Sequence, residues 1–185
     1  STLAALHKAN RTGKGESIDM AMYETLLAIG QYYLVDYLNE GILWPRPGAR
    51  NQNLCGIGEY KCNDGFLGVC LYGVDQNKYF LETIGLGHLW GTEDIPEDTS
   101  GLWLSNPHAA EIEAAFEAYC LEHSKYEIEA DFAAHRIAAQ VVMEFEDLVK
   151  EEHLKLRDDF MDWETEDGKT FKGLRVFPKF QQTPG

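Results

Sequence analysis

The stretch RTGKGESIDMAMYETLLAIGQYYLVDYLNEG, residues 11–41, decides how the chain folds. It opens on a turn at Gly13-Lys14-Gly15, because glycine adopts positive-φ conformations that other residues avoid. The alternation of polar and apolar residues over Ser17–Met20 predicts a brief strand. From Met22 onward, apolar residues recur at three- and four-residue steps until a closing glycine. That spacing predicts one long helix over residues 22–41.

This helix is apolar on most of its sides. Leu27, Leu34 and Leu38 widen the apolar stripe until little of the surface suits water. A helix of this kind needs neighbours on several sides. We therefore expect it to pack against further chain or against a second subunit.

The rest of the chain changes character after Trp44-Pro45-Arg46-Pro47-Gly48, where two prolines interrupt regular structure. Asp64-Gly65 lies between two short apolar runs and predicts a β-hairpin. Ser124 predicts a helix start, as do Asp75 and the pair Asn106-Pro107. The expected strands cover 58–62, 66–71, 138–142, 160–163 and 171–177, and the expected helices cover 2–10, 75–84, 107–123, 125–136, 144–149 and 151–157, with a long loop over 91–107.

Composition and charge exclude several classes of protein. The 185 residues are 44% hydrophobic, enough for a real core, and no apolar run approaches the roughly 20 residues that a membrane span needs. The net charge of −15 lies entirely after residue 50, so the chain lacks the basic stripe of a nucleic-acid-binding protein. The acidic run over residues 144–167 is typical of a solvated face. We expect a cytoplasmic protein with neither a nucleic-acid nor a membrane partner.

The cysteines and histidines do not predict a metal site. Cys55, Cys62, Cys70 and Cys120 match no zinc-binding spacing, and we expect them to be buried small hydrophobes or surface thiols. The six histidines are scattered singly, and His7 is expected at the edge of a core.

The candidate ligand-binding residues lie just after the proline-rich segment. Gly56 and Gly58 flank one residue, and backbone without side chains permits a ligand to approach closely, although glycines at such a place more often form a turn that enters the hairpin. Arg50 precedes them, and a guanidinium binds a carboxylate or phosphate through two hydrogen bonds, although surface arginines are often only solvated. We therefore name Arg50, Gly56 and Gly58 as candidates for binding an anionic cofactor.

Several motifs resemble those of one known family. The run Gly13–Glu24, GKGESIDMAMYE, followed by a long apolar helix, resembles the family III CoA-transferases, and most of all the carnitine CoA-transferases. The resemblance continues through five further segments along the chain. These are Leu3–Lys8, Tyr60–Gly65, Ile84–His88 and Asp167–Thr170, with Phe177–Phe180 near the end.

The resemblance implies an α/β fold. Residues 1–43 would belong to a Rossmann-like large domain, residues 44–143 to a small α+β domain with helices around a short antiparallel sheet, and residues 144–185 to a segment returning to the large domain. Family members form interlocked homodimers, which would cover the apolar helix.

The resemblance also implies the chemistry. The family transfers coenzyme A from an acyl-CoA to an acid, here a carnitine-like acid, through an aspartate nucleophile and without a tightly bound cofactor. That aspartate would lie upstream of Ser1, and Asp19 is not it, so this chain alone is expected to be inactive. Another family III transferase, an acyl-CoA racemase of the same fold, or a non-catalytic dimerisation or binding module remain alternatives.

Overall fold

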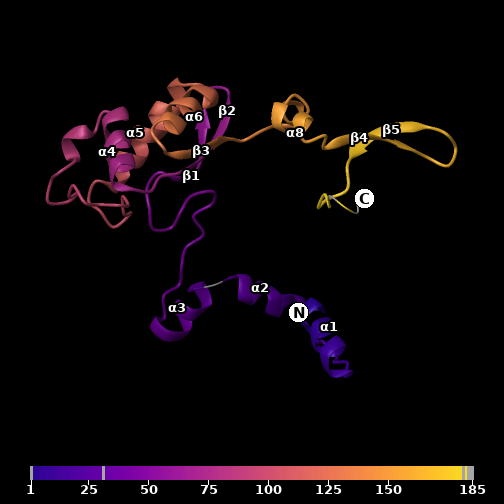
Figure 1. Ribbon diagram of the computed structural model, residues 1–185. Coiled ribbons are helices and arrows are strands. Elements are labelled where there is room, and N and C mark those ends of the chain that lie inside the picture. The colour runs from indigo at the N-terminus through magenta and orange to yellow at the C-terminus, as the bar shows by residue number, and fades with distance from the viewer. Residues whose placement is uncertain (1, 31, 181, 183–185) are drawn as a thin grey trace. The chain divides into compact units, whose positions relative to one another are not determined.

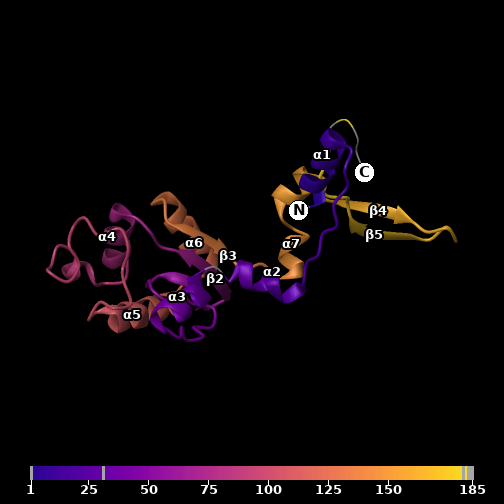
Figure 2. The same cartoon turned by 90° about the horizontal axis from the view of Figure 1, so that it is seen from below.

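The structure is a computed structural model that describes residues 2–30, 32–180 and 182. The chain divides into two compact units, residues 1–48 and residues 49–185. Figures 1 and 2 show the elements of each unit from two directions. The predicted division at residues 43 and 143 stays a prediction.

The first unit consists of three helices, α1 (Thr2–Thr12), α2 (Met22–Ile29) and α3 (Tyr32–Glu40). Gly13 and Gly41 end α1 and α3 as predicted, each with φ near +70°. The single helix predicted over residues 22–41 is wrong, because Gly30 closes α2 instead. Glycine costs about 1 kcal/mol relative to alanine inside a helix, so the run divides there. Gln31, which this prediction also covered, lies outside the described residues.

The strand predicted at Ser17–Met20 is also wrong. A strand needs a neighbour for its backbone groups. Both sheets formed by the described residues lie in the second unit, so residues 14–21 have no regular structure. His7, expected at a core edge, is exposed.

The helices of the first unit leave many apolar side chains uncovered. Leu26, Ile29 and Leu38 are each at least 68% exposed. Trp44 partly covers α3, since its indole N–H donates to Asp36 Oδ2 at 2.7 Å. Within the described residues, no helix combines the length and apolar character needed to cross a membrane.

The second unit is built on a three-stranded antiparallel sheet in the order β1-β2-β3. The strands are β1 (Ile57–Cys62), β2 (Gly65–Cys70) and β3 (Ala138–Val141). The predicted hairpin is confirmed, with Cys62 opposite Gly65 and the turn on Asn63-Asp64. One face of the sheet is buried. It carries Tyr60, Cys62, Leu67, Val69 and Val141.

Helices cover this face of the sheet. They are α4 (Val74–Thr83), α5 (Ala109–Glu122) and α6 (Lys125–Ala134), with a 3₁₀ turn η1 (Gly87–Leu89) between α4 and α5. Helix α6 lies beside β3 in both views (Figures 1 and 2). Helices around a short antiparallel sheet are therefore confirmed, whereas the Rossmann-like domain stays a prediction.

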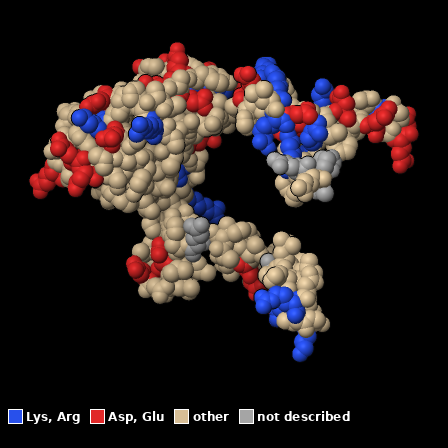
Figure 3. Space-filling model, viewed as in Figure 1, with Lys and Arg blue, Asp and Glu red and all other residues tan. Residues whose placement is uncertain are grey.

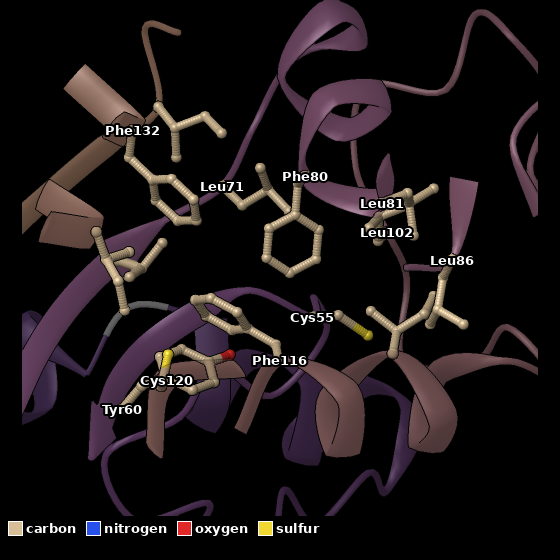
Figure 4. Close-up of a cluster of buried hydrophobic side chains, with 14 of the residues drawn as sticks. Cys55, Tyr60, Leu71, Phe80, Leu81, Leu86, Leu102, Phe116, Cys120 and Phe132 are labelled. Carbon is tan, nitrogen blue, oxygen red and sulfur yellow. The ribbon is translucent and has the colours of Figure 1, made fainter. Parts of the chain in front are cut away.

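An aromatic cluster fills the space between sheet and helices (Figure 4). The ring of Phe116 lies 4.4 Å from that of Tyr60, 4.8 Å from that of Phe80 and 6.0 Å from that of Phe132, measured between centroids. All four side chains are at most 1% exposed. Phe116 thus joins β1, α4 and α6 in one core.

The helix starts were predicted with mixed success. Ser124 caps α6 as expected, because its hydroxyl accepts the Tyr126 N–H and Glu127 accepts the Ser124 N–H. Asp75 is not a cap, since α4 begins one residue earlier at Val74. Asn106 caps the turn before α5, where its side-chain oxygen accepts the His108 N–H at 2.8 Å, and the helix itself starts at Ala109.

The last part of the unit contains α7 (Phe145–Leu148), α8 (Glu152–Leu156) and a hairpin of β4 (Phe160–Glu164) and β5 (Thr170–Leu174). These elements match the predicted ones to within a few residues. Acidic side chains are spread over the surface seen in Figure 3. Most of those in residues 144–167 are exposed as expected, but Asp159 is buried and pairs with Lys179 and Arg157.

Candidate functional site

The three candidate ligand-binding residues lie in one tight loop, Ala49–Gly58, which leads into β1. Its two ends form a bridge in which Arg50 is opposite Gly58. The Asn51 N–H donates to the Ile57 carbonyl at 2.8 Å, and Asn51 Oδ1 accepts the N–H groups of Asn53 and Leu54. The structure therefore brings Arg50, Gly56 and Gly58 together, and backbone hydrogen bonds fix the loop between them.

Close packing explains why both loop positions are glycine. Gly56 has φ +68°, and a Cβ there would lie 2.7 Å from Leu71 Cδ2. Gly58 has φ +145°, and a Cβ there would lie 2.5 Å from the carbonyl oxygen of Ala49. The loop closes tightly only because neither residue has a side chain.

One carboxylate from α5 binds the loop from the side. Glu113 Oε1 accepts the Gly56 N–H at 2.8 Å and lies 3.0 Å from the Tyr60 hydroxyl, which donates to this carboxylate. Glu113 Oε2 accepts Arg50 Nη1–H at 3.1 Å. Helix α5 holds this side chain in place because its neighbours Ile112 and Phe116 are buried in the core. Glu113 therefore satisfies a backbone, a phenol and a guanidinium donor at once.

Arg50 has two further partners. Its Cζ lies 3.4 Å from the centroid of the Tyr60 ring, which is cation–π geometry. Its Nη2 is 2.9 Å from Oε1 of Glu117, one helical turn after Glu113. The Arg50 side chain is 27% exposed, the Glu113 side chain 22% and the Glu117 side chain 56%. The guanidinium thus has one sheltered carboxylate partner and one largely exposed one.

The electrostatics of this site keep its reactive groups protonated. Burial raises the pKa of Tyr60 far above its usual value, and the charge of Glu113 raises it further. Burial and the same carboxylate raise the pKa of the Cys55 thiol to about 12. Because the thiolate is the nucleophilic form of cysteine, this shift disfavours Cys55 as a nucleophile. Glu113 can hold the loop backbone and the Arg50 guanidinium in place, and Tyr60 and Cys55 serve as neutral hydrogen-bond donors.

The sequence predicted the loop residues but missed their partners on α5. Glu113 and Glu117 are four residues apart, a spacing that places both on one helix face. An amphipathic helix with exposed glutamates has the same pattern, so only the long-range contact identifies them. Tyr60 was noted only within a family motif.

The other cysteines, the possible metal ligands and the hollows of the second unit add no further candidate residues. Cys62 and Cys120 are buried free thiols, and Cys70 is an exposed one. In the part of the chain that the structure describes, no three or more His, Cys, Asp or Glu side chains are placed to hold a metal ion. A hollow of about 620 Å³ lies between α8 and the β4–β5 hairpin, with Leu154, Phe160 and Leu174 in its walls.

Solved structures share this fold at low sequence identity. Rv3272 from Mycobacterium tuberculosis in its orthorhombic form has a TM-score of 0.68 and 16% identity, over 99% of this chain and 46% of that chain. A CAIB/BAIF family protein from Brucella suis has a TM-score of 0.66 and 21% identity, over 98% of this chain and 46% of that chain. This chain thus spans less than half the length of either protein.

The sequence itself matches one family throughout. Residues 1–185 correspond to CoA-transferase family III. The match therefore extends beyond the hairpin and the Ala49–Gly58 loop to the whole chain. The chain belongs to CoA-transferase family III.

Proposed function

We propose that this chain forms part of a longer CoA-transferase that moves coenzyme A between an acyl-CoA, such as crotonobetainyl- or butyrobetainyl-CoA, and a carnitine-like acid. The match of residues 1–185 to CoA-transferase family III carries the proposal. The solved structures of similar fold are more than twice as long, which supports a longer polypeptide.

The proposed reaction proceeds through an aspartate supplied by the rest of that polypeptide. Its carboxylate attacks the thioester, releases CoA thiolate and forms an acyl-aspartyl anhydride. The thiolate then attacks the aspartyl carbonyl, which releases the first acid and leaves an aspartyl-CoA thioester. The acceptor carboxylate attacks that thioester, which releases CoA thiolate and forms a second acyl-aspartyl anhydride. The thiolate then attacks the acyl carbonyl of the acceptor, which gives the new acyl-CoA and frees the aspartate. The covalent intermediates divide one difficult acyl exchange into several easier steps.

Within this chain, we propose that Arg50, Gly56 and Gly58 contact coenzyme A. Arg50 supports this role because its guanidinium is partly exposed and a phosphate group matches its geometry. Gly56 and Gly58 enter the proposal through their residue type, because backbone without side chains permits close approach, although Leu71 and the Ala49 carbonyl fill the space beside them. The proposed enzyme is cytoplasmic and requires no tightly bound cofactor.

We further propose a homodimer. The uncovered apolar side chains on α2 and α3 support it, because such faces mark contacts with other protein surface. The same observation favours the second candidate function, an assembly module without catalytic activity.

The test is a CoA-exchange assay with the full-length protein and a panel of acids. Transfer to carnitine or γ-butyrobetaine in preference to simple dicarboxylic acids is the expected result. Transfer to a different acid would assign another family III activity, and epimerisation of a chiral 2-methylacyl-CoA would assign a racemase. Under the proposal, the 185-residue chain alone has no activity, so turnover by it would contradict the upstream placement of the nucleophile.

A further inference from the structure

The two carboxylates that contact Arg50 differ in every respect that decides whether a ligand can displace them. Glu113 is 22% exposed and makes bonds to Gly56 and Tyr60 besides Arg50. Glu117 is 56% exposed, and among the described residues its carboxylate pairs with Arg50, Oε1 to Nη2 at 2.9 Å. Displacing Glu113 would leave the fully buried Tyr60 hydroxyl without an acceptor, which costs far more than releasing one solvated ion pair.

The loop depends on Glu113 but has no such dependence on Glu117. The Gly56 N–H donates to Glu113, so this side chain holds the backbone of the loop at Gly56. The Glu113–Arg50 bond and the Tyr60 ring together hold the plane of the guanidinium. Glu117 contacts only the outward end of the same guanidinium.

We propose that Glu113 and Glu117 act on Arg50 in opposite senses: Glu113 positions Arg50 and the Ala49–Gly58 loop to bind coenzyme A, whereas Glu117 competes with a phosphate of coenzyme A for Arg50 Nη2. This inference rests on the proposed function, since it takes coenzyme A as the ligand of Arg50. A phosphate carries more negative charge than a carboxylate, so it can replace Glu117 as the partner of Arg50 Nη2. Glu113 is a positioning residue and Glu117 sets the affinity.

The test compares three isosteric variants of the full-length protein by isothermal titration with coenzyme A. E117Q removes the competing charge and is expected to lower the Kd by about two- to fivefold, the range for one exposed ion pair. E113Q weakens the bonds to Gly56 and Arg50 in the loop and to Tyr60 beside it, and is expected to raise the Kd by about tenfold or more. E122Q is the matched control, because it removes one exposed charge from the same helix, and no change in Kd is expected.

Two further measurements separate positioning and competition from a general structural effect. Titration with pantetheine, which lacks the phosphates, is expected to give the same Kd for E117Q and wild type. Hydrogen exchange at the Gly56 amide is expected to be faster in E113Q and unchanged in E117Q, because only Glu113 accepts that N–H. A merely structural role would weaken binding of both ligands in both variants.

The proposal is overturned if E117Q binds coenzyme A no more tightly than E122Q, or if its effect persists with pantetheine. It is also overturned if E113Q leaves the Gly56 amide and the Kd unchanged. Should E113Q fail to fold, the comparison of E117Q with E122Q still decides the competition. If the wild-type protein does not bind coenzyme A at all, the proposed function itself is wrong, a result distinct from wild-type binding with no difference between E117Q and E122Q.

Discussion

Replacing Glu113 with alanine is expected to destabilise the second unit far more than replacing Glu117. Glu113→Ala leaves the Tyr60 hydroxyl and the Gly56 N–H without their acceptor, and both groups are buried. An unsatisfied buried donor costs about 1–3 kcal/mol, so the two together lower the free energy of unfolding by about 2–6 kcal/mol. Arg50 adds little, because it is partly solvated and retains Glu117. Glu117→Ala removes one exposed ion pair and is expected to cost less than about 1 kcal/mol.

Native-state hydrogen exchange of the slowest amides in β2 and α5 measures this free energy for the second unit by itself. A double-mutant cycle with Tyr60→Phe isolates the phenol. In the Tyr60→Phe background, Glu113→Ala no longer leaves a hydroxyl unpaired, and its cost is expected to fall by about 1–2 kcal/mol. Equal costs in both backgrounds, or a cost of Glu113→Ala no larger than that of Glu117→Ala, would refute the hydrogen-bond network as the source of stability.

Three other perturbations test the fold. Cys70 is exposed, whereas Cys120 is buried and its burial raises the pKa of its thiol. A maleimide is therefore expected to label Cys70 in the native protein and Cys120 only after denaturation. Rapid labelling of Cys120 in the native protein would contradict its burial. The Asp64 carboxylate accepts the backbone N–H of Lys125, and this hydrogen bond is the main reason why the pKa of Asp64 is lowered. The ionised carboxylate therefore stabilises the folded state at neutral pH, and this contribution is lost as the pH falls through the lowered pKa. Urea denaturation at pH 7 and at a pH below that lowered pKa is therefore expected to show Asp64→Asn destabilising at neutral pH and nearly neutral in acid, and a pH-independent difference would refute this linkage. Phe116→Ala removes the ring at the centre of the aromatic cluster and is expected to cost about 3–5 kcal/mol in the same denaturation, where a loss below about 1 kcal/mol would contradict the packing.

Local signals in the sequence predicted the second unit well. The Asp64-Gly65 pair placed the first hairpin, and the register confirms a connection of two residues, Asn63 and Asp64. Ser124 was predicted to start a helix, and α6 begins directly after it, where the structure adds Glu127 as the second half of a capping box. Both signals work because the residues that specify the structure are also the ones that make its hydrogen bonds.

Predictions failed where the structure depends on a partner or a competing local cost. The alternation at Ser17–Met20 is compatible with a strand, yet no described strand pairs with it. The apolar stripe of residues 22–41 has helical spacing throughout, but the pattern does not weigh the cost of Gly30 within it. Periodicity reports which side of an element suits burial, and it says nothing about where that element is interrupted.

The candidate site shows the same division at longer range. Arg50, Gly56 and Gly58 were named from residue type and proximity in sequence, and they do share one loop. Glu113 lies 57 residues after Gly56, and no local signal connects the two. The sequence therefore identified two donors of the network, Arg50 and Gly56, but neither the Tyr60 hydroxyl nor the carboxylate that binds all three.

That missing carboxylate changes how the role of the glycines can be tested. Substituting Gly58 would bring a Cβ to 2.5 Å from the Ala49 carbonyl oxygen, so a variant such as Gly58→Ala would lose coenzyme A binding through distortion of the loop even if no ligand ever touched it. Gly56→Ala would similarly crowd Leu71. Loss of activity in either glycine variant thus fails to distinguish a binding loop from a packed turn. Glu117→Gln leaves every backbone contact of the loop in place and alters the charge facing Arg50, so a gain of affinity that Glu122→Gln does not share indicates a ligand that meets the guanidinium.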